Sequence, residues 1–230
     1  MTDRYFSADA IEGPTALLTG SEAHHLLHVM RAAPGCEVVL FDGRGGEFTA
    51  EVARCGRAEV ELAVGPRCNV ERELPFELTL AVPLPKGDRQ RWLVEKAVEL
   101  GVSRLMPLKT ARSEGGCDEA AAKLRRYVIE ASKQCGRNRL MEIAPAIQWA
   151  ALLRKTGKRR LVAHPGGRPL GQLQLERAAN TVLAIGPEGG LTEEEVAQAI
   201  QADWKVVALG ERILRVETAA LALIAQLLVE

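Results

Sequence analysis

Two patterns of apolar and polar residues divide the chain near residue 70. Between residues 37 and 66, apolar and polar residues alternate in three short runs, "EVVLFDG", "GEFTAEVARC" and "AEVELAVGP". A period of two is typical of strands that bury one face, and glycines between the first two runs predict a turn. We therefore expect a small β-barrel, preceded by a short helix that has Ser21 as its N-cap and ends before Pro34.

After residue 76, short apolar runs alternate with helical patterns. The expected strands are 78–82, 104–108, 160–164, 181–185 and 205–209, and the expected helices are 88–100, 118–135, about 148–156, 192–203 and 217–228. This alternation predicts an α/β fold with a parallel sheet that helices cover on both faces. The polar segment 65–75 is bracketed by prolines and resembles a linker, so we expect two domains, at residues 1–70 and 76–230.

Three loops follow expected strands of this sheet: "HPGG" at 164–167, "GPEGGL" at 186–191 and "GERILRV" at 210–216. Ligands of parallel α/β sheets bind at the carboxyl ends of the strands, so these are candidate binding loops. The second loop matches neither common glycine-rich phosphate motif and lacks the lysine of a triphosphate site. Thr192 and Glu195 have capping-box spacing, but Glu188 lies before the cap. A loop rich in backbone groups with one carboxylate favours a neutral or cationic ligand, such as an adenosine that carries a sulfonium.

The charge of the chain is unevenly distributed, although its formal net charge is zero. Residues 1–75 hold 7 basic and 12 acidic residues, whereas residues 86–160 hold 18 basic and 8 acidic ones. A basic middle segment indicates either a local anionic partner or solvated helix faces. Arg126, Lys133 and Arg137 fall opposite the apolar face of the expected helix 118–135. They lead into "GRNR", a loop that suits a phosphate or the edge of a base.

Other features narrow the class of protein. Five scattered cysteines fit reduced thiols in a cytosol and show no zinc spacing. The N-terminus has no apolar signal region, and the longest apolar run, 219–229, is too short to span a bilayer. His24 and His28 have the spacing of a helical pair, but no acid or cysteine completes a site, so we expect no metal. The last expected helix is apolar almost all round, which favours burial in a core or an interface.

Several longer motifs occur along the chain: "HLLHVMRAAPG" with "LFDG", "KGDRQRWLVEKAVELGVSRLMPLKTARS", "EASKQCGRNRL", "AIGPEGGLTEEE" and "ALGERILRVETAALALIAQL". Together they closely resemble the RsmE family in the SPOUT class of RNA methyltransferases. Met30 departs from the expected leucine but has a similar volume. The resemblance implies a SPOUT domain whose chain forms a trefoil knot, preceded by a PUA-like β-barrel, and a homodimer. It also implies a cytoplasmic enzyme that uses S-adenosylmethionine to methylate N3 of a uridine in 16S ribosomal RNA.

The resemblance also assigns candidate site residues. The expected catalytic residues are Arg215, Arg137, Asn138 and Glu217. The expected cofactor-binding residues are His164, Pro165, Gly186, Pro187, Glu188, Gly189, Gly190, Leu209, Gly210, Ile213, Leu214 and Arg215. The expected RNA-binding residues are Arg4, His25, Arg31, Lys86, Arg89, Arg112, Arg126, Lys133, Arg137 and Arg139.

Methylation at N3 makes specific demands on such a site. N3 of uracil holds a proton at neutral pH, so the site must assist its loss, stabilise charge on O2 and O4, and align the reactants. Arginines such as Arg215 and Arg137 are natural partners of that charge, and the base is Glu217, Glu188 or water. Three alternatives stay open: a SPOUT enzyme acting on another RNA such as transfer RNA, a non-catalytic RNA-binding module of the same fold, and a nucleotide hydrolase. The missing phosphate-binding loop weighs against the hydrolase.

Overall fold

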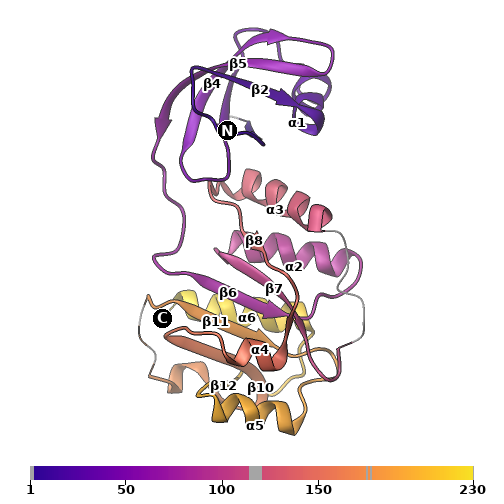
Figure 1. Ribbon diagram of the computed structural model, residues 1–230, viewed down its shortest axis with the longest axis vertical. Coiled ribbons are helices and arrows are strands. Elements are labelled where there is room, and N and C mark those ends of the chain that lie inside the picture. The colour runs from indigo at the N-terminus through magenta and orange to yellow at the C-terminus, as the bar shows by residue number, and fades with distance from the viewer. Residues whose placement is uncertain (1–2, 114–120, 175, 177, 230) are drawn as a thin grey trace. The chain divides into compact units, whose positions relative to one another are not determined.

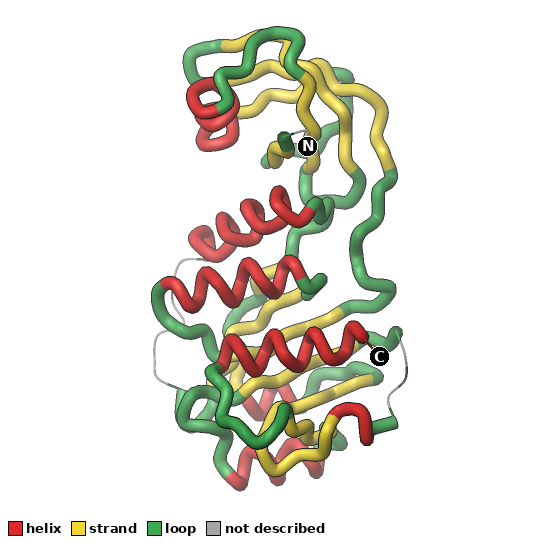
Figure 2. Tube along the Cα trace, turned by 180° about the vertical axis from the view of Figure 1, so that it is seen from behind, coloured by secondary structure: helices red, strands yellow, loops and turns green. Residues whose placement is uncertain are grey.

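The computed structural model describes residues 3–113, 121–174, 176 and 178–229 (Figures 1 and 2). The chain divides into two compact units. The first unit comprises Met1–Glu73 and Ile129–Leu140, and the second unit comprises Leu74–Val128 and Met141–Glu230. Residues 129–140 lie inside the predicted second domain by sequence, but their packing groups them with the first unit.

The first unit is built on a five-stranded mixed sheet with the order β1-β3-β4-β5-β2. Its strands are β1 (Arg4–Phe6), β2 (Thr15–Thr19), β3 (Glu37–Phe41), β4 (Glu47–Cys55) and β5 (Glu59–Cys68). β1 runs parallel to β3, and the other neighbours are antiparallel. Alternate residues of β4, namely Phe48, Ala50 and Val52, are buried in one core, as its period of two predicts. The three strands expected between residues 37 and 66 are confirmed.

Three details of this unit differ from the sequence prediction. The helical segment comprises α1 (Gly20–His24) and the π-helical turn η1 (His25–Val29), and Thr19 rather than Ser21 occupies its N-cap position. The sheet is curled, but β1 and β2 form two ends of its order, so the barrel is an open half-barrel. β1 and β2 themselves are short and weakly alternating, and for this reason the pattern did not indicate them.

The second unit contains a sheet of parallel strands with the order β12-β10-β11-β6-β7-β8, and β9 also pairs with β7. The strands are β6 (Leu78–Val82), β7 (Arg104–Lys109), β8 (Glu142–Ile143), β9 (Ile147–Gln148), β10 (Arg159–Pro169), β11 (Thr181–Ile185) and β12 (Lys205–Ala208). The neighbours β6 and β11 are buried almost throughout, as expected of central strands covered on both faces. The α/β fold and its five expected strands are confirmed, and the trefoil knot stays a prediction. The expectation of a loop at 164–167 is corrected, because β10 continues through it to Pro169, with an irregular pairing to β12 between Ala163 and Arg168.

Helices cover both faces of this sheet. The helical elements of the chain after β5 are α2 (Asp88–Glu99), α3 (Ala121–Cys135), α4 (Trp149–Leu153), η2 (Leu170–Gln172, a 3₁₀ turn), α5 (Glu193–Gln201) and α6 (Val216–Val229). Residues 129–135 of α3 belong to the first unit. α2 and α6 lie on one face, and α4 and α5 lie on the other (Figures 1 and 2). Residues 118–120 of the expected helix 118–135 lie outside the described residues. Within the described ranges, no helix has the length and apolar character to cross a bilayer.

The last helix, α6, is only partly covered. It packs against α2, β6 and β11, and Leu223 and Ile224 are fully buried there. Ala225 and Leu228 on its other side are exposed, with Leu228 at 37%. The predicted burial of α6 is therefore confirmed for the side with Leu223 and Ile224. For the side with Ala225 and Leu228, an interface stays a prediction.

Candidate functional site

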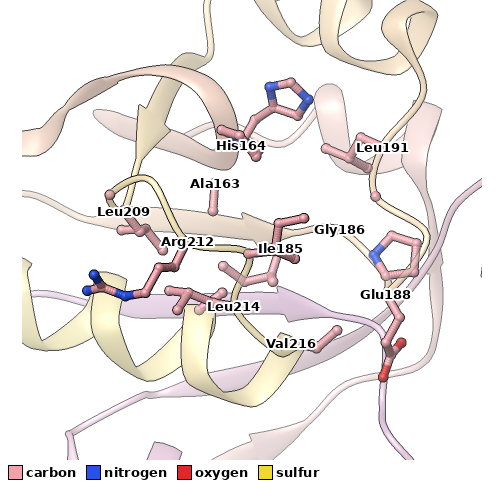
Figure 3. Close-up of a pocket in the computed structure, with 16 residues that line it drawn as sticks. Ala163, His164, Ile185, Gly186, Glu188, Leu191, Leu209, Arg212, Leu214 and Val216 are labelled. Carbon is pink, nitrogen blue, oxygen red and sulfur yellow. The ribbon is translucent and has the colours of Figure 1, made fainter.

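The middle of β10 and the loops after β11 and β12 surround one cavity in the second unit (Figure 3). β12, β10 and β11 are neighbours in the parallel sheet, so their carboxyl ends meet at one edge. Residues of β10, of the end of β11, of the two loops and of the start of α6 line the cavity: Ala163, His164, Pro165, Ile185, Gly186, Pro187, Glu188, Gly190, Leu191, Leu209, Gly210, Arg212, Ile213, Leu214, Val216 and Ala219. A cavity therefore lies at the carboxyl ends of the parallel strands, where the sequence predicts ligand binding.

The lining can be compared with the residues expected to bind a cofactor. All of those residues line the cavity except Gly189 and Arg215. The cavity also includes Ala163, Ile185, Leu191, Arg212, Val216 and Ala219, which the motifs did not single out. Ala163 lies within β10 and Ile185 ends β11, and in a sequence such apolar strand residues look like ordinary core.

The loop after β11 has the conformation that its glycines and its cap require. The Thr192 Oγ1 accepts a hydrogen bond from the Glu195 backbone N–H at 3.1 Å, and the Glu195 carboxylate accepts one from the Thr192 backbone N–H at 2.9 Å. The predicted capping box is therefore confirmed. Gly190 has a φ of +71°, in the region that favours glycine, and nothing lies within 4 Å of its missing side chain.

The two carboxylates that we considered as bases share one cation, Arg89 of α2. Its guanidinium donates to both oxygens of Glu217, at 2.8 and 2.7 Å, and to Glu188 at 3.0 Å. The Glu217 side chain is 7% exposed and that of Glu188 is 57% exposed. In Figure 3 the carboxylate of Glu188 points away from the other labelled side chains. The resemblance predicts that Arg89 binds RNA, whereas its contacts connect it to the loop after β11 and to the start of α6.

Exposed arginines surround the same loops. Arg112 donates to the backbone carbonyl of Gly189 at 2.8 Å, which ties the segment after β7 to the glycine loop. The side chains of Arg212 and Arg215 are exposed and form no ion pair with any residue that the structure describes. Arg215 is also near enough to Glu217 to favour the ionised form of that carboxyl. These side chains are available to an incoming anionic group.

The basic loop 136–139 of the first unit has a different environment. Arg137 is 3% exposed, its Nε donates to Glu73 at 3.0 Å, and its Nη2 forms a second, shorter hydrogen bond to the same carboxylate. Asn138 is equally buried, accepts from Arg4 at 2.6 Å and donates to the Val70 carbonyl at 3.0 Å. Both expected catalytic residues of this loop are therefore engaged inside the first unit.

The remaining residues expected to bind RNA fall into two groups. The Arg4 side chain is 12% exposed and pairs with Glu47, and that of Lys133 is 14% exposed and pairs with Glu22. His25 is half-buried, with its Nδ1 3.4 Å from the Tyr5 hydroxyl. The exposed residues are Arg31, Lys86, Arg112, Arg126 and Arg139. The sequence could not distinguish the buried basic residues from the exposed ones, because their burial depends on residues that are distant in the sequence.

The two histidines considered as a metal pair, His24 and His28, are exposed with ring centroids 4.7 Å apart. In the part of the chain that the structure describes, no cluster of three or more histidine, cysteine, aspartate or glutamate residues has a metal-binding arrangement. Cys117 lies outside the described residues.

The composition of the cavity fits the ligand that the sequence suggested. Its walls are mainly apolar, which suits a purine ring, and the glycines at 186, 190 and 210 leave backbone groups accessible. Glu188 lies at the rim with its carboxylate paired to Arg89, and the lining contains no lysine among the described residues. An adenosine that carries a sulfonium matches this combination better than a nucleoside triphosphate does.

Comparisons with known proteins agree with this geometry. Residues 72–228 match the model of an RNA methyltransferase domain, and residues 18–64 match that of an RNA methyltransferase PUA domain. The chain is 32% identical to ribosomal RNA small subunit methyltransferase E of Bacillus subtilis over 91% of this chain and 88% of that protein. It is 31% identical to the Synechocystis protein of the same name over 93% of this chain and 72% of that protein.

Solved structures are also similar over the whole chain. The ribosomal RNA small subunit methyltransferase E of Neisseria gonorrhoeae, bound to S-adenosylmethionine, has a TM-score of 0.90 and 31% identity, covering 100% of this chain and 98% of that one. A methyltransferase from Legionella pneumophila described as putative, in complex with the same cofactor, has a TM-score of 0.92 and 28% identity with the same coverage.

Proposed function

Because the chain belongs to the ribosomal RNA small subunit methyltransferase E family, we propose that it methylates N3 of one uridine in 16S ribosomal RNA. The chain is an S-adenosylmethionine-dependent ribosomal RNA methyltransferase. The observation that carries the proposal is the cavity at the carboxyl edge of the parallel sheet, where an apolar wall, accessible glycine backbone and one carboxylate lie together. What we propose beyond the family's activity is the position that is methylated, N3 of a single uridine.

In this proposal the cavity walls position the methyl donor. S-adenosylmethionine, when bound, supplies an electrophilic methyl group on a sulfonium. The glycine backbone and the apolar residues around Leu209 and Leu214 hold the adenosine and exclude water from it. Arg215, exposed beside Glu217, lies where it can stabilise the negative charge that develops on O2 or O4 as N3 loses its proton.

Arg137 and Asn138 have a different part in the proposal. Because both side chains are buried and hydrogen-bonded within the first unit, we assign them to holding residues 129–140 against β1 and the segment 70–73. Arg215 remains the proposed catalytic arginine. The exposed Arg31, Arg112, Arg126 and Arg139 are the proposed contacts to RNA phosphates.

We also propose a cytoplasmic homodimer that acts on the small ribosomal subunit. The exposed side of α6, with Ala225 and Leu228, is the proposed dimer surface, because an apolar helix side exposed in one chain is typical of an interface. Light scattering at micromolar concentration should give twice the mass of one chain. A monomer that still methylates would exclude the dimer.

The central experiment compares ribosomal RNA from cells with and without the gene by mass spectrometry. We expect one N3-methyluridine in 16S RNA to disappear without the gene and to return when the wild-type gene is restored, but not the Arg215→Ala variant. Unchanged 16S RNA together with a lost methyl group in transfer RNA would support the other substrate. Calorimetry that finds no binding of S-adenosylmethionine would support a non-catalytic RNA-binding module.

A further inference from the structure

Arg89 connects three elements that are far apart in the sequence. It lies in the first turn of α2, whereas Glu188 lies in the loop after β11 and Glu217 in the first turn of α6. The loop and the start of α6 both contribute to the cavity wall, through Glu188 and Val216. Arg89 itself does not line the cavity. Any influence of Arg89 on the ligand therefore passes through the residues that it holds.

The two contacts of Arg89 are unequal. Its Nε and Nη2 bind both oxygens of Glu217, at 2.8 and 2.7 Å, in the bidentate geometry that only arginine provides. A single hydrogen bond of 3.0 Å joins Nη2 to Glu188, whose side chain is largely exposed. Glu217 is thus the fixed partner, and Glu188 is held on the solvent side of the pair.

The charges in this cluster reinforce the geometry. Hydrogen bonds from Arg89 hold the pKa of the Glu217 carboxyl below its ordinary value, against burial, which raises it. The charge of Arg215 acts in the same direction. Glu217 is therefore ionised at neutral pH with both oxygens engaged, and an engaged carboxylate is a poor acceptor for a substrate proton.

We propose that Arg89 is a positioning residue for methyl transfer, which holds the glycine loop and the start of α6 at a fixed spacing across the cavity, with Glu217 as its counter-ion. The proposal rests on the proposed function, since it concerns the same cavity. Glu217 takes no proton in the reaction, and the N3 proton leaves to water. The electron pair of N3 then forms the bond to the methyl carbon, and the S–CH₃ pair stays on sulfur.

The test uses the full-length protein and measures cofactor binding apart from RNA binding. The variants are Arg89→Met, Arg89→Lys, Glu217→Gln and the double variant Arg89→Met/Glu217→Gln. Arg91→Met is the matched control, because Arg91 lies on the same helix, 58% exposed, and pairs with Glu95. Calorimetry measures the affinity for S-adenosylmethionine, filter binding measures RNA affinity at several salt concentrations, and single-turnover methylation measures the rate. Thermal unfolding confirms that each variant is folded.

Arg89→Met should weaken cofactor binding roughly tenfold, within the range of coupled neighbours, and leave RNA affinity and its salt dependence unchanged. Arg89→Lys should recover part of the loss, because it restores the charge without the fork. The double variant should bind the cofactor no more weakly than Arg89→Met alone. Arg91→Met should behave as wild type.

Two outcomes would overturn the proposal. If Arg89→Met flattens the salt dependence of RNA binding and leaves cofactor affinity intact, Arg89 is a phosphate contact. If Glu217→Gln abolishes turnover while the cofactor still binds with wild-type affinity, Glu217 is the base. Failure of the proposed function appears separately, as a wild-type protein that does not bind S-adenosylmethionine.

Discussion

Two arginine-bearing loops of this chain look alike in sequence and differ in structure. In loop 136–139 of the first unit, Arg137 is buried and paired with Glu73. In loop 210–215 of the second unit, Arg212 and Arg215 are exposed beside the cavity. The first loop has its counter-charges within its own unit, whereas the second leaves its charges available. A basic motif in the sequence therefore indicates a ligand site only where its arginines are not already paired with carboxylates of the protein.

The burial of loop 136–139 has an identifiable origin. The Gly45 backbone N–H donates to the carbonyl of Asn138 at 2.9 Å, and Arg72 donates to the carbonyl of Gly136 at 2.9 Å. These partners come from the turn before β4 and from the segment that leaves the first unit. The loop thus fixes residues 129–140 to a unit that the chain left more than fifty residues earlier.

The largest effect should come from Arg137→Ala. Removal of one partner leaves the Glu73 carboxylate without its bidentate counter-charge, and breaking such a buried pair costs about 3–5 kcal/mol. We expect a clear fall in the unfolding midpoint by calorimetry. Arg139→Ala is the control in the same loop, because Arg139 is 55% exposed and 3.8 Å from Glu71, and its midpoint should hardly move. A folded, equally stable Arg137→Ala protein with slow turnover would restore the catalytic role.

Arg215→Ala should have the opposite profile. Arg215 is exposed and forms no ion pair with a residue that the structure describes, so it contributes little to folding and the unfolding midpoint should stay near that of wild type. If Arg215 stabilises charge on uracil, single-turnover methylation should slow by about 100-fold, as for the loss of one oxyanion donor. Affinities for RNA and cofactor should change much less, since the contact forms in the transition state. An unchanged rate would remove Arg215 from the catalytic site.

Gly190→Val tests whether the second loop needs its backbone shape. A φ of +71° costs a β-branched residue about 1–2 kcal/mol or more, although nothing within 4 Å blocks the side chain. Cofactor affinity should fall roughly tenfold by calorimetry as the loop relaxes. Gly35→Val is the matched control, because Gly35 also has a positive φ, +92°, with nothing within 4 Å, and does not line the cavity. Equal losses of cofactor affinity in both variants would point to general destabilisation and not to the shape of the loop.

The sequence predicts the elements of the second unit better than those of the first. β6 and β11 are continuous apolar runs with helices between them, so pattern and fold agree. β1 has three residues and pairs in parallel with β3 across more than thirty residues, and no local pattern indicates such a partner. The capping box of α5 was predictable because both of its residues lie within four positions.

The site shows the same division between local and distant information. The glycine loop, the middle of β10 and the segment after β12 carry motifs, so most residues of the cavity wall could be named in advance. The sequence could not predict that Arg89 binds both Glu188 and Glu217, because the three residues come from separate elements. Likewise, the spacing of Arg126, Lys133 and Arg137 predicts one basic row, but distant carboxylates pair with Lys133 and Arg137.

The smallest effect is expected for Arg126→Ala in α3, a helix that carries both an exposed and a paired basic residue. Arg126 is exposed, whereas the Lys133 side chain is 14% exposed and pairs with Glu22 at 3.1 Å. Arg126→Ala should therefore weaken RNA binding modestly and flatten its salt slope by about one unit, the mark of one lost phosphate contact. Lys133→Ala should leave that slope unchanged and lower the unfolding midpoint instead, because the Glu22 carboxylate loses its cation and keeps, among the contacts that the structure describes, only the hydrogen bond from the Phe6 backbone N–H. Filter binding across a salt series, with thermal unfolding beside it, separates the two variants. If Arg126→Ala binds RNA like wild type at every salt concentration, the exposed side of α3 is a solvated surface. The electrostatic contribution to RNA affinity would then come from Arg31, Arg112 and Arg139.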